Sequence, residues 1–218
     1  MNLFPKKKVE SFRSFKIESL KHKIQNKIEI TDSDFDSLYP EKIQQLSAVQ
    51  WTPVNVILQI HLQMKFSKQD RILDIGSGVG KFCLLSSLVS QARFFGIEKR
   101  KNLFEIAEAV QRDLKVKNVK FKLGEMTSVD WSNYNVFYFY NPFYESLTAE
   151  NTIDDQMEKG LQKFTLDLIR VKNRLSLLPK TTKVITYHSF GGKMPNSYEQ
   201  TKKISLVTGD IEFYEKME

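Results

Sequence analysis

The chain has 218 residues, of which 41% are hydrophobic, 33 are Lys or Arg and 26 are Asp or Glu, so its formal net charge is +7. This length suffices for one full hydrophobic core without disulfide bonds. The longest apolar run, residues 136–140, is far shorter than the roughly 20 residues of a bilayer-spanning helix. The first residues lack the apolar stretch of a secretory signal, and we expect a cytoplasmic protein with no membrane partner.

The cysteine and histidine residues do not indicate a metal site. Cys83 is the single cysteine, and His22, His61 and His188 are too far apart in sequence for the usual spacings of zinc ligands. We therefore expect no metal. Positive charge gathers in residues 1–30, which hold eight Lys or Arg and three Glu. This segment is either a solvated basic face or a surface that attracts nucleic acid or an acidic protein.

Residues 1–50 have apolar residues at helical spacing and no strand-like run, which predicts an N-terminal helical extension. We expect this extension to act as a lid or as a platform for a substrate. A helix is predicted to follow, with Thr52 as its N-cap and Pro53 in its first helical position. Nothing after residue 50 resembles a linker, so we expect residues 51–218 to form one domain.

From residue 70 onward, short apolar segments alternate with amphipathic helices. The predicted strands cover residues 71–75, 92–97, 119–123, 136–140 and 183–188, and residues 157–175 have the periodicity of a long helix. Strands that alternate with helices form a parallel sheet covered on both faces, so the predicted fold class is α/β. Near the C-terminus, residues 204–207 and 211–214 flank Thr208-Gly209-Asp210, which predicts an antiparallel hairpin with a three-residue loop.

A glycine-rich turn lies between the first predicted strand and the next helix. It has the sequence Asp74-Ile75-Gly76-Ser77-Gly78-Val79-Gly80. Glycines allow a tight turn and a close approach of ligand to backbone, and open α/β sheets bind ligands at their strand ends. Glu98 ends the second strand, where its carboxylate can accept hydrogen bonds from both hydroxyls of a ribose. The sequence therefore predicts a doubly wound, Rossmann-like sheet that binds a nucleoside.

The spacing of the glycines argues against a nicotinamide dinucleotide. The dinucleotide fingerprint requires Gly or Ala at the position of Lys81. The Asp74 carboxylate would also lie near the pyrophosphate, which is an unfavourable contact between like charges. S-adenosylmethionine has no phosphate, and it carries a sulfonium and an ammonium group. It therefore fits better, and a nicotinamide oxidoreductase is the least favoured function.

These motifs resemble those of class I S-adenosylmethionine-dependent methyltransferases. The similarity rests on the glycine turn, Glu98 and Gly124-Glu125-Met126, and it spans residues 50–218. It implies a seven-stranded sheet with S-adenosylmethionine as cofactor. By position, Asp74 and the turn would hold the methionine moiety, Glu98 the ribose, and Glu125 with Met126 the adenine. The expected cofactor-binding residues are Thr52, Asp74, Gly76, Ser77, Gly78, Gly80, Glu98, Lys99, Glu125, Met126 and Asn141.

Two segments suggest narrower similarities. The glycine turn together with Gly96-Ile97-Glu98-Lys99 is similar to non-SET histone lysine methyltransferases. Asn141-Pro142-Phe143 resembles the Asn/Asp-Pro-Pro-Tyr/Phe signature of methyltransferases that act on amine or amide nitrogens, although its second Pro is missing. The resemblance implies that Asn141, Pro142 and Phe143 form the catalytic segment. The Asn side chain and a backbone carbonyl would accept two N–H groups, and Phe143 would stack on a planar substrate.

The leading hypothesis is a methyltransferase that modifies a nitrogen of a protein or a nucleic acid. Methyl transfer from a sulfonium is an in-line displacement, so positioning of the two reactants is the main requirement. Tyr140, Tyr144, Glu145 and His188 lie near strand ends, but the pattern does not select one of them as a general base. Methylation of a small metabolite and a non-catalytic cofactor-binding module stay as alternatives. The sequence does not indicate an oligomeric state.

Overall fold

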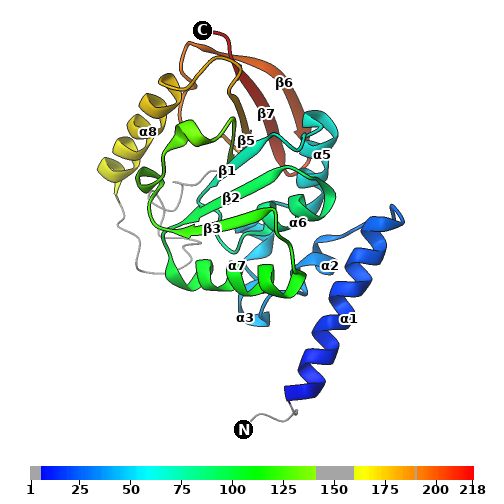
Figure 1. The fold of residues 1–218 in the computed structure, drawn as a ribbon. Coiled ribbons are helices and arrows are strands. Elements are labelled where there is room, and N and C mark those ends of the chain that lie inside the picture. Colours follow the sequence, from blue (N-terminus) through cyan, green and yellow to red (C-terminus); the bar gives the residue numbers. More distant parts are fainter. Residues whose placement is uncertain (1–5, 141–159, 190) are drawn as a thin grey trace.

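A computed structural model describes residues 6–140, 160–189 and 191–218, with side chains from residue 14 onward except that of Leu161. Within these residues, seven strands form one sheet in the order β3-β2-β1-β4-β5-β7-β6 (Figure 1). The strands are β1 (Arg71–Ile75), β2 (Arg93–Glu98), β3 (Val119–Leu123), β4 (Val136–Tyr140), β5 (Lys183–Tyr187), β6 (Tyr198–Leu206) and β7 (Gly209–Lys216). Strands β1 to β5 pair in parallel, and β7 is antiparallel to both β5 and β6.

This topology confirms the predicted α/β, Rossmann-like sheet with an antiparallel C-terminal end. The chain turns to opposite sides of β1 when it places β2 and β4, so the carboxyl ends of β1, β2 and β4 surround a crevice of the kind in which such sheets bind ligands. Every residue of β4 except Tyr140 is buried. The sequence predicted β1, β3 and β4 with the bounds that the structure has, and β2 and β5 to within one residue.

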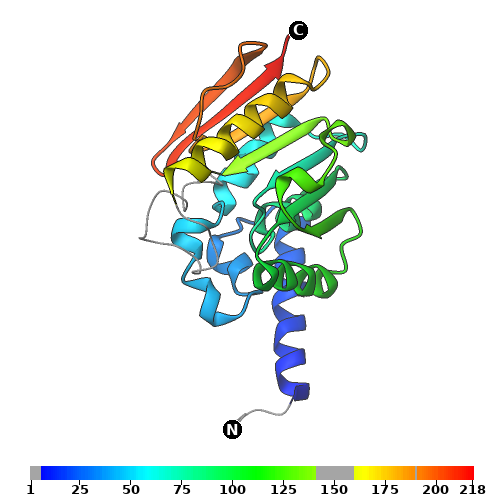
Figure 2. The same ribbon diagram turned by 90° about the vertical axis from the view of Figure 1, so that its left-hand side faces the viewer.

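Helices cover both faces of the sheet. They are α1 (Lys6–Gln25), α2 (Asp32–Asp36), α3 (Glu41–Gln44), α4 (Ser47–Gln50), α5 (Val54–Met64), α6 (Lys81–Val89), α7 (Lys101–Leu114) and α8 (Leu161–Ser176), with short 3-10 turns η1 (Met126–Ser128) and η2 (Trp131–Asn133). Residues of α5, α6 and α7 share one hydrophobic cluster with one face of the sheet. Residues of α8 and the 3-10 turns share a second cluster with the other face (Figure 2).

The N-terminal helices belong to the first of these clusters. Ile17 and Leu20 of α1 and Phe35 of α2 are buried in the cluster that also contains the residues of α5 and α6. The N-terminal end of α1 projects from the rest of the chain, while Phe15 on the same helix is 70% exposed (Figures 1 and 2). None of the helices in the described part of the chain has the length and apolar character needed to cross a membrane.

Three predictions about the second half of the chain need correction or stay open. The C-terminal hairpin has a two-residue loop, Val207-Thr208, because Gly209 already pairs with Leu206; the predicted three-residue loop Thr208–Asp210 was wrong. Strand β6 is also longer than predicted, since its exposed polar residues pair with β7 without an apolar pattern. The predicted helix start at residue 157 lies outside the described residues, and the described part of α8 ends before Pro179.

Candidate functional site

The glycine turn connects β1 to α6 and is held against the end of β2. The backbone N–H groups of Gly76 and Ser77 both donate to the Ile97 carbonyl oxygen at 3.0 Å. Gly80 has a φ of +78°, and a Cβ there would overlap the Phe121 ring, so packing requires glycine at this position. A Cβ at Gly78 would meet no atom within 4 Å. The turn therefore leaves open space beside Gly78, where a ligand can approach the backbone.

Glu98 lies at the end of β2, directly beside the turn. Its side chain is 3% exposed, and its Oε2 atom accepts a hydrogen bond from the Gly78 N–H at 2.9 Å. Oε1 accepts bonds from the Arg100 backbone N–H and from Arg100 Nε, both at 2.9 Å. Arg100 Nη2 lies 3.3 Å from Oε2. The guanidinium of Arg100 therefore forms a two-pronged ion pair with this carboxylate.

Asp74 lies on the neighbouring strand β1, where it is paired in register with Gly96 of β2 and Tyr138 of β4. The residue is 3% exposed, and the Cys83 thiol lies 3.5 Å from its Oδ2 atom. Burial raises the pKa of Asp74 to about 8; the hydrogen bond from Cys83 opposes this shift, and the charge of Glu98 adds to it. A cationic group placed beside Asp74 would favour the ionised form of its carboxyl group. The methionine end of S-adenosylmethionine would supply such a cation.

Thr52 does not cap α5, in contrast to the sequence-based prediction. Pro53 is the N-cap and has no side-chain capping bond, while Thr52 Oγ1 lies 2.8 Å from the Tyr138 hydroxyl. The Tyr138 ring stacks on Phe82 of α6 with 3.8 Å between ring centroids. A buried hydroxyl needs a hydrogen-bonding partner, and Thr52 fulfils this need for Tyr138. Thr52 thus joins the start of α5 to the middle of the sheet, beside Asp74.

Lys81, the first residue of α6, joins the turn to the N-terminal segment, defined here as residues 6–50. Its side chain is 2% exposed, and its Nζ atom lies 2.6 Å from Asp32 Oδ1 and 2.7 Å from Asp36 Oδ1. Ser47 also donates a hydrogen bond to Asp36. Burial raises the pKa of Asp36, and the hydrogen bond from Lys81 opposes this shift. The N-terminal segment is thus tied by a buried ion pair to the helix that begins at the glycine turn.

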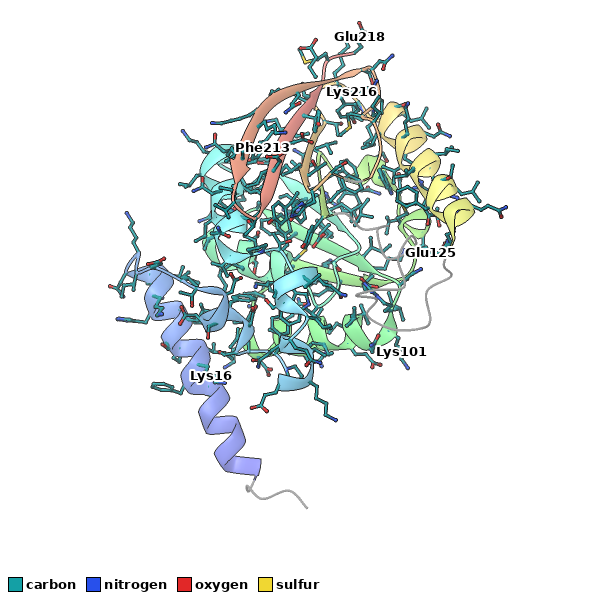
Figure 3. All side chains as sticks on the ribbon, turned by 180° about the vertical axis from the view of Figure 1, so that it is seen from behind. Lys16, Lys101, Glu125, Phe213, Lys216 and Glu218 are labelled. Carbon is teal, nitrogen blue, oxygen red and sulfur yellow. The ribbon has the colours of Figure 1, made fainter. Side chains whose placement is uncertain are left out.

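The remaining cofactor candidates line the same edge of the sheet. The Gly124 N–H donates to the Glu98 carbonyl oxygen at 2.9 Å, and Glu125 is exposed while Met126 is buried. Lys99 is also exposed, next to Glu98. Figure 3 shows Glu125 on the same side of the molecule as Lys101, at the start of α7, and Lys16 of α1 on the other side. The Ser77 hydroxyl is buried without a hydrogen-bonding partner among the described residues.

Three rings gather at the carboxyl ends of β4 and β5. The centroid of Tyr140 lies 5.0 Å from that of Tyr187, and the His188 ring lies 4.2 Å from Tyr187 and 5.8 Å from Tyr140. His188 and Ser189 both have a positive φ, of 57° and 64°. Consecutive left-handed residues other than glycine are strained, and such strain is common at functional sites. The predicted catalytic residues Asn141, Pro142 and Phe143 come directly after Tyr140 but lie outside the described residues.

The structure therefore brings Asp74, the glycine turn, Glu98 and the 124–126 segment to one edge of the sheet. Sequence reasoning missed Arg100, although its position two residues after Glu98 was a local signal. It also missed the bond between Thr52 and Tyr138, since 86 residues separate these two partners. The ion pair between Lys81 and Asp36 was missed for the same reason.

A family model described as a methyltransferase domain matches residues 66–186, which is more than half of the chain. The chain belongs to this methyltransferase family. Together with the sheet order, this makes the protein a class I methyltransferase that depends on S-adenosylmethionine. The residues at the crevice fit this cofactor. The space at Gly78 offers room, the Ser77 hydroxyl has no hydrogen-bonding partner among the described residues and can bond to a ligand, and the buried carboxyl groups of Asp74 and Glu98 can bind a cationic group and hydroxyl donors.

Solved structures support the same fold for this methyltransferase. An RNA methyltransferase from Salinibacter ruber, in complex with S-adenosylhomocysteine, is 18% identical with a TM-score of 0.55, covering 77% of this chain and 94% of that one. A putative methyltransferase from Escherichia coli is 13% identical with a TM-score of 0.51, covering 74% and 84%. A ribosomal protein methylase from Lactobacillus delbrueckii subsp. bulgaricus is 12% identical with a TM-score of 0.50, covering 82% and 81%. A search among curated proteins finds no match.

Proposed function

We propose that this methyltransferase transfers the methyl group to an amine or amide nitrogen of a protein or a nucleic acid. The observation that carries the proposal is the position of Asn141-Pro142-Phe143, directly after the carboxyl end of β4. This segment follows Tyr140, whose ring lies against Tyr187 and His188. Aromatic side chains at this edge would favour a planar base or the aliphatic part of a side chain. The net charge of +7 favours an acceptor with negative charge around it.

In this proposal, the crevice residues divide the cofactor between them. Asp74 and the 76–80 turn hold the charged methionine end, the Ser77 hydroxyl donates to it, and Thr52 supports this side through Tyr138. Glu98 accepts the ribose hydroxyls, with Lys99 beside it at the surface. Glu125 and the Met126 backbone meet the adenine. Asn141 serves in this proposal as a contact for both the methyl donor and the acceptor nitrogen, and the N-terminal segment serves as a lid or a platform.

The chemistry needs little beyond positioning. When bound, the cofactor would supply a methyl group on a sulfonium sulfur. The acceptor nitrogen would attack the methyl carbon opposite the sulfur, the carbon–sulfur bond would break, and S-adenosylhomocysteine would leave as a neutral thioether. Hydrogen bonds from the acceptor N–H groups to Asn141 would aim the nitrogen lone pair at the methyl carbon. A lysine amine would have to lose its proton before the attack, whereas an amide or a ring amino group loses it during or after the attack.

A labelled methyl donor tests this proposal. Purified protein is incubated with the labelled donor and with cell extract in which either RNA or protein has been digested. We expect label in a macromolecule, and N-methylated nucleosides or amino acids on mass spectrometry after hydrolysis. We expect Gly78→Ala to abolish transfer by filling the open space at the turn, while Asn141→Ala lowers kcat far more than the affinity for S-adenosylhomocysteine. Label on oxygen, carbon or a small metabolite would contradict the proposal.

A further inference from the structure

The carboxylate of Glu98 already has a full set of hydrogen-bond donors from the protein. Each carboxylate oxygen offers about two lone-pair positions. Oε1 accepts from the Arg100 backbone N–H and from Arg100 Nε, and Oε2 accepts from the Gly78 N–H and from Arg100 Nη2. Two of these four donors are backbone groups held by the turn and by the start of α7. The other two belong to one side chain, that of Arg100.

A ribose would approach Glu98 in the same way as the Arg100 guanidinium. Its two hydroxyls are neighbouring donors, and they would reach the two carboxylate oxygens as a pair. The Nε and Nη2 atoms of Arg100 form this kind of fork, since they lie 2.9 Å from Oε1 and 3.3 Å from Oε2. With the backbone donors in place, the carboxylate has no positions left for both hydroxyls. The ribose and the guanidinium therefore need the same two positions.

Burial supports this reading. The Glu98 side chain is 3% exposed and the Arg100 side chain 11% exposed, so this ion pair is buried and is not a solvent-exposed surface pair. Arg100 is the N-cap of α7, so a rotation about its side-chain bonds would displace the guanidinium without moving the helix backbone. After such a movement, Glu98 would keep its two backbone hydrogen bonds and its orientation.

We propose that Arg100 competes with the ribose hydroxyls for Glu98, so that cofactor binding displaces the guanidinium and Arg100 sets the affinity for the cofactor. This inference rests on the proposed role of Glu98 as the ribose-binding residue. In this scheme Arg100 acts on the cofactor through Glu98, as a competitor for its carboxylate. The fraction of molecules in which Arg100 has turned away limits the apparent affinity of the cofactor.

Isothermal titration with S-adenosylhomocysteine tests the competition. We expect Arg100→Ala to lower the dissociation constant by about threefold to tenfold, since the competing fork is gone. Arg100→Lys keeps the charge but can bind only one oxygen at a time, so we expect a smaller change of the same sign. Arg93→Ala is the matched control. It removes an exposed arginine at the start of β2, the strand that ends with Glu98, and it should leave the affinity for S-adenosylhomocysteine unchanged. Thermal unfolding of each variant verifies that it is folded.

A ligand without the ribose hydroxyls separates competition from a general effect of charge. The 2′,3′-dideoxy analogue of S-adenosylhomocysteine cannot form the paired contact, so we expect equal affinities for the original chain and for Arg100→Ala. If both Arg100 variants bind S-adenosylhomocysteine as weakly as the original chain or more weakly, Arg100 orients Glu98 and the proposed competition is wrong. If the wild-type protein binds no S-adenosylhomocysteine, the proposed ribose-binding role of Glu98 is wrong, and the proposed competition by Arg100 is wrong for that reason.

Discussion

Asp74 and Glu98 both lie at the same edge of the sheet, but their carboxyl groups have different hydrogen-bonding partners. Glu98 accepts hydrogen bonds from the Gly78 and Arg100 backbone N–H groups and from the Arg100 guanidinium. Asp74 has the Cys83 thiol, a weak donor, within hydrogen-bonding distance and is buried, so its pKa rises to about 8. The Asp74 carboxyl group is therefore protonated near neutral pH in the absence of a ligand, and a bound cation would favour its ionised form.

The raised pKa of Asp74 predicts a loss of stability with rising pH. In the unfolded chain Asp ionises near pH 4, so between about pH 4 and pH 8 only the folded state holds this proton. The free energy of unfolding must then fall as the pH rises. Below pH 6.5 the effect is partly offset by His61, because burial lowers its pKa to about 4 and gives the opposite slope. From pH 6.5 to 8 we expect a loss of about 1 to 2 kcal/mol in urea unfolding.

Two variants check the source of this slope. Asp74→Asn cannot titrate, so its free energy of unfolding should stay level from pH 6.5 to 8. Asp130→Asn removes an exposed carboxylate whose pKa is lowered by hydrogen bonds from Ser132, and it should keep the original slope in this range. Parallel curves for the original chain and Asp74→Asn would show that Asp74 is already ionised in the folded state.

At the scale of elements, the strands with a clear apolar pattern could be predicted well, and the mostly polar strand β6 could not. Strands β1 and β4 are covered on both faces, so each reads as a short apolar run with clear ends. Strand β6 is exposed over most of its length, and its bounds depend on pairing with β7. The site follows the same rule, because the glycine turn and Glu98 are local motifs. Thr52 with Tyr138, and Lys81 with Asp36, meet only after the chain has folded.

The buried ion pair between Lys81 and Asp36 joins two helices, α6 and α2, that were predicted separately. Lys81→Met would leave Asp36 buried without its cation, and we expect the free energy of unfolding to fall by about 3–5 kcal/mol. Lys101→Met is the control, since Lys101 is 74% exposed in its pair with Glu105, and we expect a change within about 0.5 kcal/mol. Urea unfolding measures both. A loss for Lys81→Met no larger than that of the control would show that the pair stabilises nothing.

At the scale of the whole molecule, the question is whether the N-terminal segment unfolds with the sheet. One hydrophobic cluster runs from Ile17 and Leu20 of α1 through Trp51 and α6 to the strands, and a second one lies on the opposite face around Trp131. The two tryptophans thus report on different faces. The Trp51 ring lies 4.7 Å from Tyr39 of the N-terminal segment, and the Trp131 ring lies 5.0 Å from Phe137 of β4.

We expect both faces to unfold in one cooperative transition, because a continuous core leaves no boundary at which the N-terminal segment could separate. Trp131→Phe leaves Trp51 as the fluorescent probe, and Trp51→Phe leaves Trp131. In each variant, the midpoint of urea unfolding measured by fluorescence should coincide with the midpoint measured by circular dichroism. The circular dichroism of the same variant is the control, because it already includes any loss of stability caused by the Trp→Phe substitution. A Trp51 signal that changes at a lower urea concentration than the circular dichroism would contradict this expectation. The N-terminal segment would then be a separate unit that unfolds while the sheet stays folded.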